Sequence, residues 1–321
     1  MKDSYLKQAK LVVRCIPAIA AERCFAIKGG TAINLFQLNL PRLSVDIDLT
    51  YVKFDDRSTA IAEINSALSR ISDRLKGLGL QVSLRGSDES KKLYCTDGEV
   101  GIKIEPNYIL RGTVYPVREM YVCDEMTRLS GCEAYMNVLS FVELYGGKVC
   151  AALDRQHPRD LFDIDRFYAE HSLSEVKEGF LALALGHNRP LHELLNPIMQ
   201  NEREVFEQQF TGMSDAPFTY EQHIATFERL RKDVLALFSA DDKSRLLDFV
   251  SLTGNLDDFG IPHLSELPAI NWKRHNLESL RKSNPVKFAE QRIRLEQLFD
   301  QNSTSIRACN PAADLLYYTP S

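Results

Sequence analysis

The periodicity of the apolar residues changes near Asn137, and this change limits the fold more than any other feature of the sequence. Before Asn137, short runs alternate between apolar and polar residues, as half-buried β-strands do. After it, apolar residues recur at helical spacing. A chain of 321 residues also exceeds the usual size of one compact domain. We therefore expect an α/β (α+β) domain with a mixed sheet at residues 1–130 and an all-helical domain at residues 131–321.

The alternating and helical segments can be assigned to elements along the chain. In the first domain we expect helices at residues 6–21, 32–38 and 58–78, with Thr31 capping the second of them. Its strands are expected at residues 24–28, 45–52, 80–84, 91–95 and 100–109, with 119–123 as an extra edge strand. In the second domain the expected helices are 138–153, 160–171, 173–185, 220–238, 241–252 and 285–299. The last dozen residues look loosely held.

Composition narrows the class of protein. No apolar stretch is long enough to cross a bilayer, and the first residues lack the apolar core of a secretory signal, so we expect a cytoplasmic protein with no membrane partner. The seven cysteines include no Cys-x-x-Cys pair, which favours free thiols over disulfides or a zinc site. The formal net charge of −5 argues against indiscriminate binding to nucleic acid, but it is compatible with a local basic surface that faces RNA.

Such a basic surface is predicted on the last helices. Residues 271–299 contain seven Lys or Arg residues against three Glu residues. An RNA backbone could follow this face, because phosphate contacts depend on clustered positive charge. The alternative is an ordinary solvated pair of helices in an acidic protein.

Two acidic residues interrupt the apolar strand at residues 45–52. Asp46 and Asp48 are two apart, so on a strand they project from the same face, about 7 Å apart along the backbone. Burying two uncompensated carboxylates costs several kcal/mol unless a cation or hydrogen-bond donors hold them. Hard oxygen ligands of this kind select Mg²⁺ or Mn²⁺. The alternative is a half-exposed strand whose outer face is acidic.

Two further features would complete a metal and phosphate site. A glycine pair follows the first strand, in the sequence Lys28-Gly29-Gly30-Thr31. Glycines let the backbone approach a ligand closely, and a following helix offers unpaired amides to a triphosphate, although a plain strand-to-helix turn explains the pattern as well. Glu105 would add a third acid, or it would pair laterally with Lys103 on the same strand face.

Residues 25–32 and 42–49 resemble the AbiEii/AbiGii nucleotidyltransferase toxins, which include the MenT toxins and belong to the DNA polymerase β superfamily. The superfamily shares two glycines, a short helix and an Asp-x-Asp strand, whereas the Lys-Gly-Gly-Thr and Arg-x-Ser-x-Asp-x-Asp patterns are narrower. The resemblance implies metal ligands at Asp46, Asp48 and Glu105, the two aspartates also being catalytic. It implies nucleotide contacts from the residues of the two patterns, namely Lys28, Gly29, Gly30, Thr31, Arg42 and Ser44.

Two local matches extend the resemblance into the helical half, at residues 144–152 and 158–163. In the family, a lysine and an aspartate at these places complete the active site. The resemblance therefore implies catalytic roles for Lys148 and Asp160, with Lys148 also contacting the nucleotide. We expect both to face the Asp-x-Asp strand across a cleft between two lobes.

The residues themselves leave other interpretations of the helical half open. Lys148 could be a surface lysine whose stem lies along apolar neighbours. Asp160 could cap the helix that begins at Leu161, and Asp163 could be an ordinary solvent-facing acid.

The resemblance also implies a function. It predicts a bilobed, Mg²⁺-dependent (or Mn²⁺-dependent) enzyme that transfers a nucleoside monophosphate from a nucleoside triphosphate to RNA, the expected acceptor being the transfer RNA 3′ end, with release of pyrophosphate. It predicts a toxin that is neutralised by a cognate antitoxin protein and acts in phage defence or growth arrest. The alternatives are an enzyme of the same fold that modifies a protein or small molecule, and an inactive nucleotide-binding module.

Overall fold

The strands form where the alternating runs predict them, and they assemble into a mixed sheet. The computed structural model describes residues 2–308, and its sheet has the strand order β3-β4-β5-β2-β1-β7-β6. β2 lies parallel to β5 and β1 lies parallel to β7, while the other neighbours are antiparallel. The strands are β1 (Phe25–Lys28), β2 (Asp46–Tyr51), β3 (Gln81–Arg85), β4 (Lys92–Thr96), β5 (Gly101–Asn107), β6 (Arg118–Tyr121) and β7 (Tyr135–Val138).

The last two strands change the expected extent of the sheet. The predicted edge strand is confirmed as β6, which lies at the end of the strand order. β7 is not among the predicted strands, because its last residue, Val138, falls where the helical periodicity begins and its pairing with β1 and β6 is a tertiary effect. It pairs with β1 through Ile27 and Val138, so the sheet runs past residue 130, where we expected the first domain to end. The helix predicted from residue 138 begins instead at Phe141.

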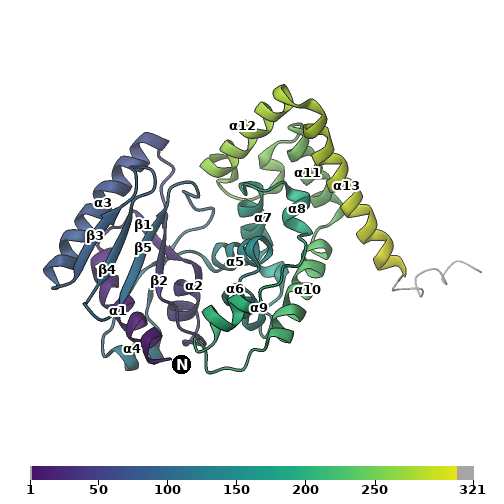
Figure 1. The fold of residues 1–321 in the computed structure, drawn as a ribbon. Helices are drawn as coiled ribbons and strands as arrows, with labels where there is room; N and C mark the ends of the chain where they lie inside the picture. The colour runs from purple at the N-terminus through teal and green to yellow at the C-terminus, as the bar shows by residue number, and fades with distance from the viewer. Residues whose placement is uncertain (1, 309–321) are drawn as a thin grey trace, which may run out of the picture.

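Two long helices, α1 (Asp3–Ala20) and α3 (Arg57–Gly77), cover one face of the sheet (Figure 1). α1 buries Val12, Ile16 and Ile19, whose spacing of three and four residues places them on one side of the helix. This side packs against the sheet and against α3. The opposite face of the sheet is left for the helical half of the chain.

The helix that follows β1 begins earlier than predicted. α2 (Gly29–Ala32) continues as a π-helical turn at Ile33–Gln37. Thr31 therefore lies inside the helix and does not cap it, and its hydroxyl donates to Ser44 Oγ at 2.8 Å. The physical reason is the positive φ of Gly29, +70°, which turns the chain directly from strand to helix.

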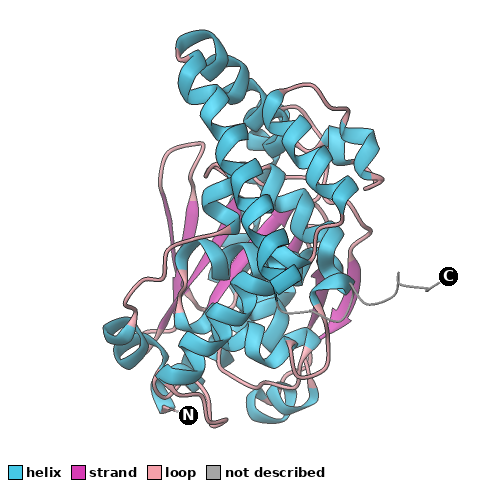
Figure 2. Cartoon of the chain, turned by 90° about the vertical axis from the view of Figure 1, so that its right-hand side faces the viewer, coloured by secondary structure: helices cyan, strands magenta, loops and turns pink. Residues whose placement is uncertain are grey.

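Helices form the second half, as predicted, and Figure 2 views the molecule from their side, with the strands behind them. α5 and α7 pack closely, since a Cβ on Gly146 would lie 2.4 Å from the backbone of Gly179. Besides α4 (Asp124–Ser130), the helices are α5 (Phe141–Arg155), α6 (Pro158–Phe167), α7 (Lys177–Leu185), α8 (Leu191–Leu195), α9 (Arg203–Val205), α10 (Tyr220–Ala236), α11 (Ala240–Ser251), α12 (Pro268–Ser283) and α13 (Pro285–Ala308). α4, α8, α9 and α12 are additions to the prediction.

Two expectations from composition can be compared with the described residues. Their cysteines are free, as predicted, and four of them are buried: Cys15, Cys24, Cys95 and Cys150. None of the described helices has both the length and the apolar character needed to span a membrane. The C-terminal dozen residues, which we expected to be loosely held, lie outside the described residues.

Candidate active site

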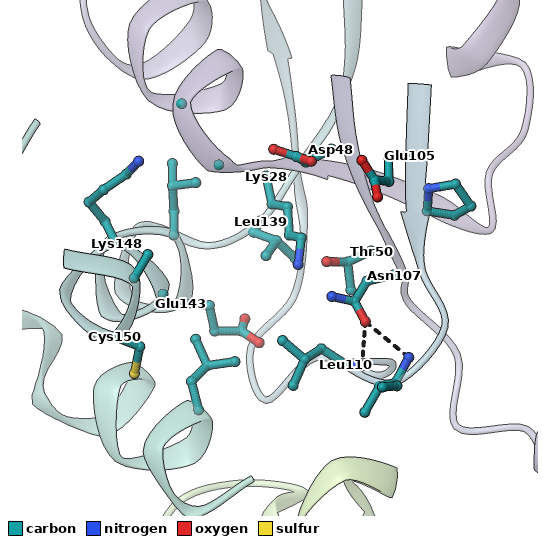
Figure 3. Close-up of a pocket in the computed structure, with 18 of the residues that line it drawn as sticks. Lys28, Asp48, Thr50, Glu105, Asn107, Leu110, Leu139, Glu143, Lys148 and Cys150 are labelled. Atoms are coloured by element: carbon teal, nitrogen blue, oxygen red, sulfur yellow. Dashed lines mark hydrogen bonds between the residues drawn. The ribbon is translucent and has the colours of Figure 1, made fainter. Parts of the chain in front are cut away.

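The register of three central strands gathers polar side chains on the face that the helical half covers. Asp48 lies opposite Lys28 of β1 and opposite Glu105 of β5, and Asp46 lies opposite Lys103. Since side chains alternate along a strand, the two aspartates share a face, as predicted. Figure 3 shows Asp48, Glu105 and Lys28 around the same space.

This space is a pocket of about 810 Å³ with walls from both halves of the chain. Its volume is in the range of ligand sites, roughly 300–1,000 Å³. The sheet supplies Asp46, Asp48 and Glu105, and the helical half supplies Lys148 and Asp160. The predicted arrangement, with these last two residues facing the Asp-x-Asp strand across a cleft, is therefore present.

The two glycines of α2 lie where there is no room for a side chain. A Cβ on Gly29 would lie 2.8 Å from Asp48 Oδ2, and a Cβ on Gly30 would lie 2.5 Å from Arg42 Nη2. Any larger side chain at either position would displace a charged group that lines the pocket. The glycine pair thus brings backbone into direct contact with the acidic face of β2.

Burial shifts the pKa values of two charged groups on this face, Asp48 and Lys28. Burial raises the pKa of Asp48, Lys28 opposes this effect, and the nearby charges of Asp46 and Glu105 add to it. Burial likewise lowers the pKa of Lys28, against the attraction of Asp48. Both shifts mark a site that lacks enough opposite charge for the groups it contains.

Both alternatives given for Glu105 are present in the structure: it lies beside the aspartates and it pairs with Lys103. It lies beside Asp48 in the register, and it also forms ion pairs with Lys103, at 2.7 Å, and with Lys92. Burial raises the pKa of Glu105, but hydrogen bonds from Lys103 and Lys92 outweigh burial and leave the pKa below its ordinary value. Glu105 is therefore already neutralised by protein.

The two aspartates differ from Glu105 in this respect. Within residues 2–308, neither the Asp46 nor the Asp48 carboxylate receives a hydrogen bond or an ion pair. As arranged, the described residues contain no group of three His, Cys, Asp or Glu side chains that could hold a metal ion. Two free carboxylates on one face nevertheless suit a hard divalent cation as a pair of oxygen ligands.

Lys148 lies at the centre of a buried ionic network. Its Nζ is 2.7 Å from Asp160 Oδ1 and 2.9 Å from Asp163 Oδ2, and all three side chains are at most 4% exposed. The interpretation of Lys148 as a surface lysine is therefore wrong. Asp160 does not cap α6, because His157 occupies the N-cap position and its side chain accepts the backbone N–H of Arg159.

The same network joins the two halves of the chain. Arg42, which precedes β2, donates to Asp163 through Nε at 2.8 Å and Nη2 at 2.6 Å, and Asn34 donates to the same carboxylate at 3.0 Å. Asp163 is 1% exposed, so its interpretation as a solvent-facing acid is also wrong. Arg42, expected to contact a nucleotide, has its guanidinium occupied by this carboxylate.

Two arginines that the sequence did not single out bring positive charge to the pocket. Arg155 attracts Asp48 and pairs with Asp160, and Arg159 is attracted by Asp46. Both line the pocket. Arg155 lies just before the 158–163 match and Arg159 lies within it, so basic residues around the start of that segment are the signal that could have identified them.

The chain was compared with protein-family models, curated proteins and solved structures. A family model described as "Nucleotidyl transferase AbiEii toxin, Type IV TA system" matches residues 10–273. No curated protein matches the chain. A solved structure, MenT4, the nucleotidyltransferase toxin Rv2826c from Mycobacterium tuberculosis H37Rv, is similar with a TM-score of 0.56 and 15% identity, over 75% of this chain and 87% of that one. The shared fold and the family match lead to one conclusion: the chain belongs to the AbiEii family of nucleotidyltransferase toxins of type IV toxin–antitoxin systems.

Proposed function

We propose that this nucleotidyltransferase toxin transfers a nucleoside monophosphate from a nucleoside triphosphate to the 3′ end of a transfer RNA, releasing pyrophosphate. The observation that carries the proposal is the pair of carboxylates, Asp46 and Asp48, which lie on one face of β2 against the Gly29 backbone and have no hydrogen-bond or ion-pair partner among the described residues. The choice of transfer RNA as acceptor rests on the resemblance of the motifs to the toxin family.

A divalent cation fits this pair of carboxylates. Asp46 and Asp48 would hold Mg²⁺ or Mn²⁺, which, when bound, supplies positive charge to the reacting phosphate and activates the attacking hydroxyl. Glu105, already paired with Lys103 and Lys92, would join as a third ligand through its remaining lone pairs or in exchange for a lysine.

The surrounding residues position the substrates. Gly29 and Gly30 let the triphosphate approach the backbone, and Lys28, Arg155 and Arg159 supply positive charge along the walls of the pocket. The acceptor hydroxyl attacks the α-phosphate in line, and catalysis comes mainly from holding the two substrates in this orientation.

The network around Lys148 has a positioning role in this scheme. Lys148, Asp160 and Asp163 tie α5 and α6 to Arg42, which precedes β2. The ion pairs thereby fix the spacing between the acidic strand and the opposite wall. We assign the nucleotide to the sheet side of the pocket, the acceptor to the helical side, and neutralisation to a cognate antitoxin protein.

The test is a transfer reaction with each labelled nucleoside triphosphate and total cellular RNA, with and without Mg²⁺. We expect label at the 3′ end of transfer RNA only when Mg²⁺ is present, and none with Asp48→Asn. Label on protein would replace the RNA acceptor by a protein. Nucleotide binding without any transfer would identify an inactive nucleotide-binding module.

A further inference from the structure

The pocket extends along β2 beyond the acidic residues. Asp46, Asp48 and Thr50 follow one another on the same face, and the lining continues past Thr50 into the loop after β5. There it includes Arg111 and Leu267, which comes from the helical half. This end is the opposite one from Arg159, which is drawn to Asp46.

Arg111 is a buried cation to which the described residues offer no hydrogen bond or ion pair. The residue is 6% exposed, and its Nε and Nη1 atoms are buried without a hydrogen bond. Arg42 lines the same pocket, is 2% exposed and is fully engaged, by Asp163 and by the carbonyl of Leu43. Among residues 2–308, the fold therefore satisfies one buried guanidinium and leaves the other without a partner, which is rare in a folded interior.

The carboxylates that attract Arg111 most strongly already have other partners. Asp55 accepts the hydroxyl proton of Tyr51. Asp56 caps α3 by accepting backbone N–H groups. Both attract Arg111, but burial and the charge of Arg57 nevertheless lower the pKa of Arg111. A partner for this guanidinium must therefore come from outside these side chains.

Asn107 provides a second donor at this end. Its Oδ1 accepts the backbone N–H groups of Ile109 at 2.9 Å and Leu110 at 2.8 Å (Figure 3). These two bonds fix the orientation of the amide, so its nitrogen is the atom left to serve a ligand. A cation and an amide donor without a nearby free acid suit a phosphate group.

We infer that Arg111, with Asn107, forms a phosphate-binding subsite at the Thr50 end of the pocket, distinct from the acidic residues on β2. The inference rests on the proposed function, since that function brings two phosphate-bearing substrates to the pocket. The phosphate belongs either to the nucleoside triphosphate or to the acceptor RNA, and binding measurements separate the two sources.

The test compares Arg111→Met with Arg57→Met in the full-length protein. Arg57 is a neighbouring cation, but its side chain is 56% exposed and already pairs with Glu89. Binding of inorganic tripolyphosphate and of a transfer RNA mixture is measured by calorimetry and by fluorescence anisotropy, without turnover. We expect Arg111→Met to weaken one of the two by about tenfold or more, Arg111→Lys to retain part of that affinity, and Arg57→Met to resemble wild type.

The outcomes distinguish a phosphate of the nucleotide from a phosphate of the RNA, and they test the subsite separately from the proposed function. Weaker binding of tripolyphosphate alone places the nucleotide at Arg111, and weaker binding of RNA alone places the acceptor there. Unchanged binding of both, or equal losses in Arg111→Met and Arg57→Met, overturns the subsite. Failure of wild type to transfer any nucleotide would refute the proposed function, whereas dependence of binding on Arg111 would still support the subsite.

Folding of the variant supplies an independent readout. Replacing an unpartnered buried guanidinium by an apolar side chain of similar length removes no contact that the fold uses. Arg111→Met should therefore melt at or above the wild-type temperature. A clear drop in melting temperature would show that Arg111 stabilises the fold through a partner and would overturn the inference.

Discussion

At the scale of single residues, Asp163 shows how strongly one buried charge can depend on its partners. It meets Arg42, Lys148 and Asn34 while 1% exposed. Removing one member of a buried ionic network leaves the others uncompensated and typically costs about 3–5 kcal/mol. We expect Asp163→Ala to lower the free energy of unfolding by about this amount, measured by urea denaturation.

A neighbouring aspartate provides the control for this measurement. Asp165 pairs with Arg166 near the surface, its side chain 26% exposed. Ion pairs of that kind contribute about 0–1 kcal/mol. Equal losses in Asp165→Ala and Asp163→Ala would mean that the buried network does not carry the stability we attribute to it.

Burial of Lys273 predicts how the stability of the protein changes with pH. The sequence placed it on a basic face, but it is 8% exposed, and its Nζ donates to the carbonyls of Asn188 and Arg189. Burial lowers the pKa of Lys273 to about 8, against the attraction of Glu193. Between pH 8 and the ordinary lysine range, the unfolded chain therefore binds more protons than the folded one, so stability rises with pH.

The comparison with Lys273→Met isolates this contribution. The free energy of unfolding of wild type should increase relative to the variant between about pH 8 and pH 10, by at most about 1.4 kcal/mol per pH unit. Urea denaturation at several pH values measures the difference. A difference that does not change with pH would show that Lys273 keeps its proton in the fold.

These residues also show where sequence reasoning stops. The type and spacing of Asp46 and Asp48 are enough to place both on one face, since a strand has a fixed period. The partner of Asp163 lies 121 residues away in the sequence, and nothing local indicates it. Arg111 has no signal at all, because its distinguishing feature is that no side chain in the described part of the chain pairs with it.

At the scale of elements, local pattern predicts most of the long units but not all of them. α1, α3, α10 and α11 form within a few residues of their predicted bounds, whereas the 16-residue α12 is not among the predicted helices and α13 continues past residue 299 to Ala308. β7 has four residues and is fixed by pairing with β1 and β6, which is a tertiary effect. The early start of α2 follows from the positive φ of one glycine, and a glycine in the sequence does not reveal its φ.

That glycine gives a prediction at the strand-to-helix turn. A Cβ on Gly29 would lie 2.8 Å from Asp48 Oδ2, and φ there is +70°. Gly29→Ala should therefore move the carboxylate and reduce transfer by about 10²-fold, as small misplacements in active sites do. Gly79→Ala is the control, because φ is +79° with nothing within 4 Å of its Cβ. It should lose some stability and keep activity, and an active Gly29→Ala would refute the contact.

At the scale of the whole molecule, Asp160 pairs with Lys148 within the helical half, and Lys148 pairs with Asp163, whose contact with Arg42 joins the two walls of the pocket. Losing a preorganised charge of this kind typically lowers a rate by about 10²–10³. We expect Lys148→Ala and Asp160→Ala each to reduce nucleotide transfer by that factor, assayed below the melting temperature of each variant. Because both side chains are buried, a loss of stability should accompany the loss of rate.

Another ion pair of the helical half, away from the pocket, is the control. Lys177 pairs with Asp242 between helices, and neither lines the pocket. Lys177→Ala should lose stability without a comparable loss of transfer. Near-normal transfer by folded Lys148→Ala would sink the positioning role of the network.

The final prediction concerns the acceptor surface on α12 and α13. Lys273 is buried, and Arg292 and Arg294 contact acids, so the basic face is narrower than the sequence suggested. Its exposed cations include Arg281 and Lys282, where α12 ends. α12 begins at the pocket, since Leu267 and Ala269 line it, and extends outward from there (Figure 1). A strand of RNA leaving the pocket along this helix would meet both cations.

Charge reversal tests whether RNA uses this path. Each phosphate contact on a single strand contributes about 0.7 to the slope of binding affinity against salt on logarithmic scales. The double variant Arg281→Glu/Lys282→Glu should weaken transfer RNA binding and flatten that slope by about 1 to 2. Arg118→Glu/Arg128→Glu, which changes exposed charges on β6 and α4, is the matched control. An unchanged slope in the first variant would place the RNA elsewhere, because a contact that releases no counterions is not a phosphate contact.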